Sequence, residues 1–99
     1  MTGSHGSGGE IRGARLLVSG RVQGVGFRYF VMQAADGFGI TGVARNLPNG
    51  DVEVIAEGPA QALAALEEVV RTGPRSAHVQ RVTREDLEVS GRYAGFHAR

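Results

Sequence analysis

The order of apolar patterns along the chain leaves few possible folds. Twice, a segment in which apolar residues recur every three or four positions, the spacing of a helix with one buried face, lies between short apolar segments with strand character. The sequence therefore predicts the order strand, helix, strand, strand, helix, strand, with a short fifth strand near the end.

Local start and stop signals give the bounds of these elements. Glycines end the first helix, Gly73-Pro74 ends the second, and the turn Pro48-Asn49-Gly50-Asp51 predicts a hairpin between the second and third strands. The predicted helices run from Phe27 to near Gly37 or Gly39 and from Pro59 to Thr72; the predicted strands are Ala14 to Ser19, Ile40 to Leu47, Val52 to Glu57, Ala77 to Val82, Leu87 to Val89 and Tyr93 to Ala98.

Each predicted helix has a single apolar stripe. The stripes consist of Phe27, Phe30, Val31, Ala34 and Phe38 in the first helix and of Ala62, Leu63, Leu66, Val69 and Val70 in the second. Two such helices can cover a small sheet by packing side by side on the same face. We therefore expect a ferredoxin-like α+β fold (βαββαβ), a two-layer sandwich with two helices on one face of a mostly antiparallel sheet of four or five strands.

Length and composition predict a single domain. A chain of 99 residues with 41% hydrophobic content allows one modest core but not two. Met1 to Gly9 is rich in glycine and serine and offers nothing to bury. We expect a flexible tail over residues 1–11 and one domain over residues 12–99.

Composition also excludes several functions. The chain has no cysteine and no lysine, which excludes disulfides, thiolate nucleophiles, cysteine zinc sites and lysine Schiff bases. A formal net charge of +1 gives no electrostatic case for nucleic-acid binding. No apolar run approaches the length of a membrane span, and no signal peptide is evident. We expect a cytoplasmic monomer that binds neither nucleic acids nor membranes.

The connection between the first strand and the first helix is typical of an anion site. It reads Gly20-Arg21-Val22-Gln23-Gly24-Val25-Gly26-Phe27-Arg28. Glycines let successive backbone N–H groups turn toward one point, and the first helical turn adds unpaired donors and the positive end of its dipole. The guanidinium of Arg28 adds a planar fork that fits two phosphate oxygens. A plain tight turn is the alternative that this loop alone leaves open.

A second candidate, Asn46, lies at the end of the second strand. A helical crossover makes the first two strands parallel, so the loop after the first strand and the end of the second meet at one edge of the sheet. The Asn46 amide can donate and accept, and can hold a water beside an anion bound at Arg28. Alone, an asparagine here more often satisfies a neighbouring turn, but its predicted position beside the loop favours the site.

Together these segments resemble the signature of the acylphosphatases. The resemblance rests on Gly20 to Arg28 and, eighteen residues after Arg28, on Asn46 within Arg45-Asn46-Leu47-Pro48-Asn49-Gly50. It covers essentially the whole domain, because the closing segment is also similar at Gly91, Tyr93, Gly95 and Phe96. The chain departs from the family pattern at Val43 and Ala44, which are smaller than usual, and at His97-Ala98-Arg99.

The resemblance implies hydrolysis of the carboxyl-phosphate bond of small acyl phosphates, without metal or cofactor. It implies that Arg28 binds the phosphate, or another anion, together with backbone amides of Gln23, Gly24, Val25, Gly26 and Phe27, and that Asn46 positions the attacking water. A non-catalytic module that binds phosphate or acyl phosphate is the alternative. An RNA-recognition domain of the same element order is weaker, because the predicted strands Ala14 to Ser19 and Val52 to Glu57 contain no aromatic residue for base stacking.

The remaining polar residues have simpler interpretations. His78 and His97 are far from each other in sequence and from any carboxylate at metal-ligand spacing, so we expect surface or packing roles. Strand alternation turns Arg45 away from Asn46 and out of the site. The pairs Glu67-Glu68 and Glu85-Asp86 are predicted to be solvated.

Overall fold

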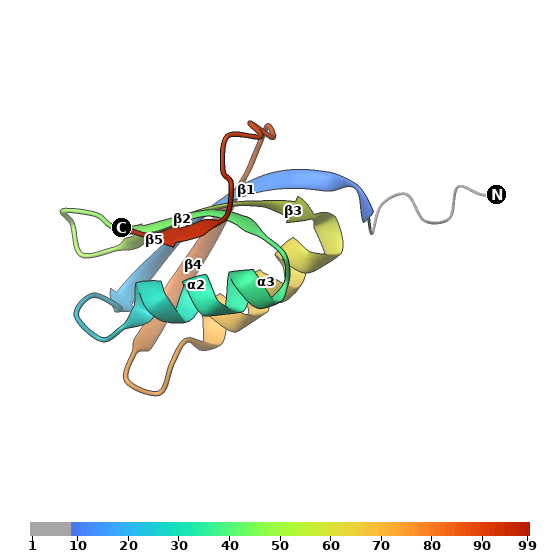
Figure 1. Cartoon of the computed structure of the whole chain (residues 1–99). Coiled ribbons are helices and arrows are strands. Elements are labelled where there is room, and N and C mark those ends of the chain that lie inside the picture. The colour runs from blue at the N-terminus through green and yellow to red at the C-terminus, as the bar shows by residue number, and fades with distance from the viewer. Residues whose placement is uncertain (1–8) are drawn as a thin grey trace.

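The structure, a computed structural model, describes residues 9–99 and has the two-layer architecture predicted above. Both helices lie on one face of a five-stranded sheet (Figure 1). The elements are β1 (Ile11–Arg21), α2 (Phe27–Gly37), β2 (Thr41–Asn46), β3 (Val52–Pro59), α3 (Ala60–Thr72), β4 (His78–Leu87) and β5 (Phe96–Ala98). The predicted tail falls mostly on residues 1–8, which lie outside the described residues, and β1 begins at Ile11, the last position assigned to that tail.

The strand order β4-β1-β3-β2-β5 places the ends of β1 and β2 at the same edge of the sheet. Both strands are antiparallel to β3, which lies between them, so they run parallel to each other. The short β5 adds to β2 as a parallel edge strand. The loop after β1 and the last residue of β2 therefore lie near each other, as the element order predicted.

The core is formed where the helical stripes meet the sheet. Buried residues of α2 and α3 pack against the residues of β1 and β3 that point toward the helices, and burial of their apolar surface is the main stabilising contribution. These residues are Phe27, Val31 and Ala35 from α2, Leu63, Leu66 and Val70 from α3, and Ala14, Leu16, Val18, Val52, Val54 and Ala56 from the sheet.

The structure differs from the sequence prediction in four places. The segments predicted as two strands, Ala77 to Val82 and Leu87 to Val89, form the single strand β4, because pairing with β1 continues through its polar residues. The third strand was predicted to end at Glu57, but β3 continues through Gly58 and Pro59, because its pairing with β1 extends to Pro59. The last strand is shorter than predicted and begins at Phe96. Phe38, expected in the stripe of α2, is an exposed residue at its C-terminal cap.

The face of the sheet opposite the helices carries two buried carboxylates from β3. Glu53 lies between the guanidinium groups of Arg15 and Arg45, each with its Nε 2.6 Å from a carboxylate oxygen. Burial alone would raise the pKa of Glu53, but hydrogen bonds from Arg45 and Arg15 outweigh it and hold that pKa below its usual value. Glu53 is therefore a charged structural centre of this face.

Glu57 anchors the segment between β4 and β5 to the same face. Its carboxylate accepts hydrogen bonds from the backbone N–H and hydroxyl of Ser90, both at 2.8 Å, and from the N–H of Gly91 at 3.0 Å. Burial would raise the pKa of Glu57, but these donors lower it. This segment rises over the sheet on the side away from the helices (Figure 1).

Candidate active site

The loop between β1 and α2 has the backbone geometry that its glycines suggest. Gly24 and Gly26 have φ angles of 76° and 78°, in the left-handed region where a side chain is strained. Gly26 is the N-cap of α2, and its carbonyl accepts the first helical hydrogen bond, from the N–H of Phe30 at 3.0 Å. A Cβ atom at either glycine would meet nothing within 4 Å, so backbone conformation, and not crowding, requires glycine here.

Two side chains fix the loop from opposite sides. Gln23 Nε2 donates to the carbonyl oxygens of Leu47 at 2.8 Å and Asp51 at 2.9 Å, which joins the loop to the β2–β3 turn. On the other side, the hydroxyl of Ser76 donates to the carbonyl of Val25 at 2.9 Å. The loop is therefore held in one conformation by contacts that use its carbonyl and side-chain groups and leave its N–H groups alone.

The N–H groups of the loop are uncommitted donors. Over residues 9–99, the backbone N–H groups of Gln23, Gly24, Val25, Gly26 and Phe27 donate no hydrogen bond of standard length and angle to another group of the protein. Most N–H groups in folded proteins are paired, and the exceptions at the start of a helix are natural anion donors. Fixed, unpaired donors at a helix N-terminus can bind a phosphate.

Arg28 lies in the first turn of α2 beside this loop. It lines a pocket of about 260 Å³ together with loop residues and the end of β5; the lining residues are Val22, Gly24, Gly26, Phe27, Arg28, Tyr29 and Ala98. Its guanidinium Nη1 donates to the carbonyl oxygen of Arg99, which follows β5. The N–H of Arg99 in turn donates to Ala44 of β2 at 2.9 Å, so Arg28 is linked through one residue to the strand that ends in Asn46.

Asn46 is exposed at the end of β2, paired with Val52 across the hairpin. The next residue, Leu47, has its carbonyl held by Gln23, so Asn46 lies directly beside the anchoring point of the loop. It does not line the pocket formed by Arg28. The structure therefore brings the two candidates to the same end of the sheet, with Arg28 lining the pocket and Asn46 next to the residue that anchors the loop.

Three contributors to this region were not assigned by the sequence analysis. Gln23 was expected to act through its backbone amide, yet its side chain anchors the loop. Tyr29, 58% exposed, borders the pocket, and Ser76 reaches the loop from a segment 51 residues away in sequence. Alternation and spacing carry no signal for contacts of this range.

The other polar residues considered in the sequence lie outside this site. Arg45 pairs with Glu53 on the opposite face, in agreement with the alternation argument. Glu67 is not solvated as expected, because its carboxylate pairs with Arg71 at 2.8 Å and Arg84 at 3.2 Å. The hydrogen bond from Arg71, assisted by Arg84, lowers the pKa of Glu67 against the effect of burial. Among residues 9–99, no group of three or more His, Asp or Glu side chains could hold a metal ion.

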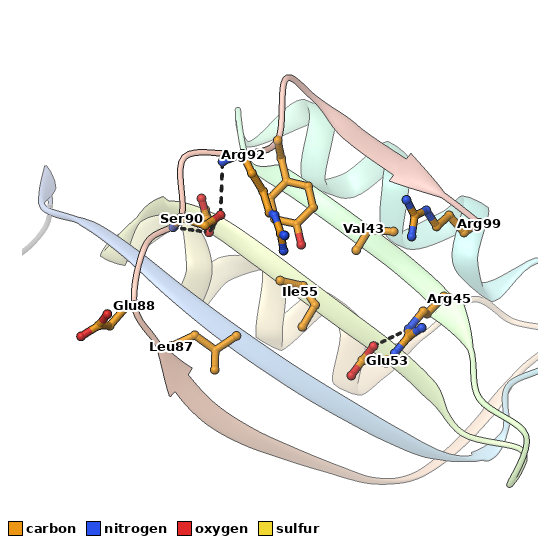
Figure 2. Close-up of a pocket in the computed structure, with 11 residues that line it drawn as sticks. Val43, Arg45, Glu53, Ile55, Leu87, Glu88, Ser90, Arg92 and Arg99 are labelled. Atoms are coloured by element: carbon orange, nitrogen blue, oxygen red, sulfur yellow. Dashed lines mark hydrogen bonds and ion pairs between the residues drawn. The ribbon is translucent and has the colours of Figure 1, made fainter.

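A hollow on the face opposite the helices lies outside this site. It measures about 440 Å³ and extends from the Arg45–Glu53 pair past Val43 and Ile55 to Ser90 and Arg92 (Figure 2). Its lining contains none of the residues from Gln23 to Arg28.

Neither helix of the described residues has the length and apolar character needed to cross a membrane.

Comparison with known proteins places these features in a family. The acylphosphatase family model matches residues 14–98. The chain is 47% identical over 81 residues to an acylphosphatase of Caldanaerobacter subterraneus, covering 82% of this chain and 90% of that protein. It is 48% identical over 81 residues to one of Thermus thermophilus, covering 82% and 91%.

A solved structure shows the same relationship in three dimensions. An acylphosphatase from Coxiella burnetii matches with a TM-score of 0.85 and 37% identity, covering 90% of this chain and 93% of that one. These matches confirm the resemblance carried by the glycine loop and the segment around Asn46. The chain therefore belongs to the acylphosphatase family, whose members are enzymes that hydrolyse acyl phosphates.

Proposed function

We propose that this chain hydrolyses small acyl phosphates by direct attack of a water molecule on phosphorus. The phosphate is bound by the N–H groups of Gln23 to Phe27 and by the guanidinium of Arg28, and Asn46 positions the water. The observation that carries the proposal is the set of fixed, unpaired N–H donors beside Arg28 at the start of α2.

The chemistry needs little more than these groups. Phosphoryl transfer passes through a loose transition state with charge spread over the phosphate oxygens, so positioning and electrostatic stabilisation supply most of the catalysis. A helix N-terminus and a guanidinium fork are suited to that charge. To bind phosphate, Arg28 exchanges its hydrogen bond to the Arg99 carbonyl for phosphate oxygens or shares its remaining N–H groups with them.

The nucleophile requires positioning more than deprotonation. A carboxylate is a good leaving group, so a neutral amide that orients the water can suffice where a poorer leaving group would need a strong base. Asn46 lies beside the loop and exposes both a donor and an acceptor. The water attacks phosphorus, the bond between phosphorus and the acyl oxygen breaks, and the products are a carboxylate and inorganic phosphate.

The test is steady-state hydrolysis of benzoyl phosphate by the purified protein, with p-nitrophenyl phosphate as the monoester control and a repeat in the presence of EDTA. We expect turnover of the acyl phosphate alone, unchanged by the chelator. Binding of benzoyl phosphate without turnover would support the non-catalytic module instead, and loss of turnover with EDTA would contradict the metal-free mechanism.

A cytoplasmic location and a monomeric state stay predictions. The loop and Arg28 recognise the phosphate, which is common to every acyl phosphate. Tyr29 borders the pocket and is exposed, so it is the side chain that we expect to meet the acyl group.

A further inference from the structure

A pocket lined by two arginines lies on the face of the sheet opposite the helices. It has a volume of about 490 Å³ and is lined by Val43, Arg92, Tyr93, Ala94, His97 and Arg99. It continues into the hollow of Figure 2, with which it shares Val43, Arg92, Tyr93 and Arg99. In that view Val43 lies between the side chains of Arg92 and Arg99.

The lining combines cationic donors with a small apolar surface. Two guanidinium groups and one imidazole lie beside Val43, Ala94 and the Tyr93 ring, and no Asp or Glu side chain is among the residues that line this pocket. Within residues 9–99, the side chains of Arg92, His97 and Arg99 take part in none of the ion pairs or hydrogen bonds. Their N–H groups are therefore available to a ligand.

The carboxylates of the neighbouring hollow form no ion pair or hydrogen bond with these donors among residues 9–99, although the charge of Arg92 contributes to the lowered pKa of Glu57. Glu53 is held between Arg15 and Arg45, and Glu57 is occupied by Ser90 and Gly91. Glu88, which also lines the hollow, is exposed and does not line the pocket of the two arginines. The guanidinium groups of Arg92 and Arg99 are therefore the charged side chains that line this pocket.

The backbone that carries the two arginines is fixed. The hydrogen bonds from Ser90 and Gly91 to Glu57 hold the segment just before Arg92, and the Ser90 hydroxyl also accepts from the N–H of Arg92 at 3.2 Å. The backbone of Arg99 is held by Ala44 on one side and by Arg28 on the other. Fixed backbone positions reduce the entropy lost when the side chains close on a ligand.

We propose that this pocket binds a small organic anion, a carboxylate attached to a flat apolar ring. The guanidinium forks of Arg92 and Arg99 would hold the carboxylate, since this pairing matches in geometry and charge. Val43 and the Tyr93 ring would contact the apolar part. The volume falls within the range of pockets that take small molecules. The lining of this site contains none of the residues from Gln23 to Arg28, and the site is linked to that loop through the hydrogen bond from Arg28 to the Arg99 carbonyl.

The test uses 2-naphthoate as the probe and the full chain labelled with ¹⁵N, in a buffer without phosphate, so that no other anion competes for the guanidinium groups. We expect saturable shifts of the amide resonances of Val43, Tyr93, Ala94 and His97. Neutral 2-naphthalenemethanol, which has the ring but no charge, should shift them weakly or not at all.

Matched variants decide the role of the arginines. Arg92→Gln and Arg99→Gln should each weaken 2-naphthoate binding roughly ten- to hundredfold, the usual effect of removing a hydrogen bond to a charged group. Arg81→Gln, an exposed arginine on β4 at the other edge of the sheet, should bind like the unmodified chain. Shifts confined to the Gln23 to Arg28 loop, absence of saturable binding, or equal affinity in all three variants would overturn the proposal.

Discussion

Buried polar groups on the outer face of β3 have hydrogen-bond partners, whereas the backbone N–H groups of the loop before α2 have none in the described chain. On β3, each buried carboxylate is fully engaged, Glu53 by two arginines and Glu57 by three donors from Ser90 and Gly91. In the loop, carbonyl and side-chain groups are tied down while five successive N–H groups are left without a partner in the described chain.

The difference separates structural charge from functional donors. A buried polar group without a partner costs stability, so an engaged carboxylate needs only a structural explanation. A row of unpaired donors held in place from both sides has no structural benefit and is suited to a ligand.

Replacing Arg28 should have the largest effect on activity. Arg28→Ala removes the guanidinium beside the loop donors and should lower kcat for benzoyl phosphate about a hundred- to a thousandfold. Arg28→Lys keeps the charge but loses the planar fork, so it should also be poor. Circular dichroism should show a retained fold in both variants, and near-normal turnover in either folded variant would contradict the role of Arg28.

Asn46→Ala should also nearly abolish turnover, about a hundredfold or more, because the amide that orients the water is lost. Phosphate is bound by other groups, so inhibition by inorganic phosphate should persist, in contrast to Arg28→Ala. Asn49→Ala in the adjacent turn is the matched control, since its side chain contacts only Asp51. Equal activity of the two variants would remove Asn46 from the site.

Glu53→Gln should lower the stability of the fold and leave the turnover of benzoyl phosphate unchanged, the opposite of the Arg28 and Asn46 variants. Glutamine keeps one acceptor oxygen, so one of the two hydrogen bonds from Arg15 and Arg45 is lost together with the negative charge, and the free energy of unfolding should fall by about 1–3 kcal/mol. Glu88→Gln, an exposed carboxylate of the same face, should change it little. Urea denaturation measures both; a Glu53 variant as stable as the Glu88 variant would show that the ion pairs contribute no net stability.

Low pH should remove the stabilisation that the ionised carboxylates of Glu53 and Glu57 provide. The pKa values of Glu53 and Glu57 are lower in the folded chain than the ordinary glutamate value of 4.5. Their stabilisation is therefore complete above that value and is lost as pH falls through the folded pKa values. Thermal unfolding between about pH 6 and pH 3 should show a smaller loss of Tm for the double variant Glu53→Gln, Glu57→Gln than for the unmodified chain; equal losses would contradict the assignment.

The sequence was sufficient for the architecture and for the family. Periodicity predicted both helices, and the turn at Pro48 to Asp51 predicted the hairpin, because these signals depend on residues close in the chain. Sequence patterns predicted strand bounds and side-chain burial less well where these depend on partners distant in the chain. The polar strand β4 was divided in two, and Glu67 was expected to face water although Arg84 reaches it from β4.

The candidate site shows the same limit. The glycines predicted the sharp turn at Gly24 and Gly26, and the parallel arrangement of the first two strands predicted that Asn46 lies near the loop. The anchoring by Gln23 and Ser76 depends on contacts over 24 to 51 residues of sequence, which no local pattern records. Anchoring is what turns a flexible glycine loop into a fixed set of donors.

The most direct measurement of the central claim is a titration of the ¹⁵N-labelled chain with inorganic phosphate, monitored through its amide resonances. The account predicts large, saturable shifts of Gly24, Val25, Gly26 and Phe27, absent in Arg28→Ala, with the side-chain amide of Asn46 shifting alongside. Phosphate that leaves these resonances unmoved while shifting others would show that the unpaired donors of the loop do not bind the anion.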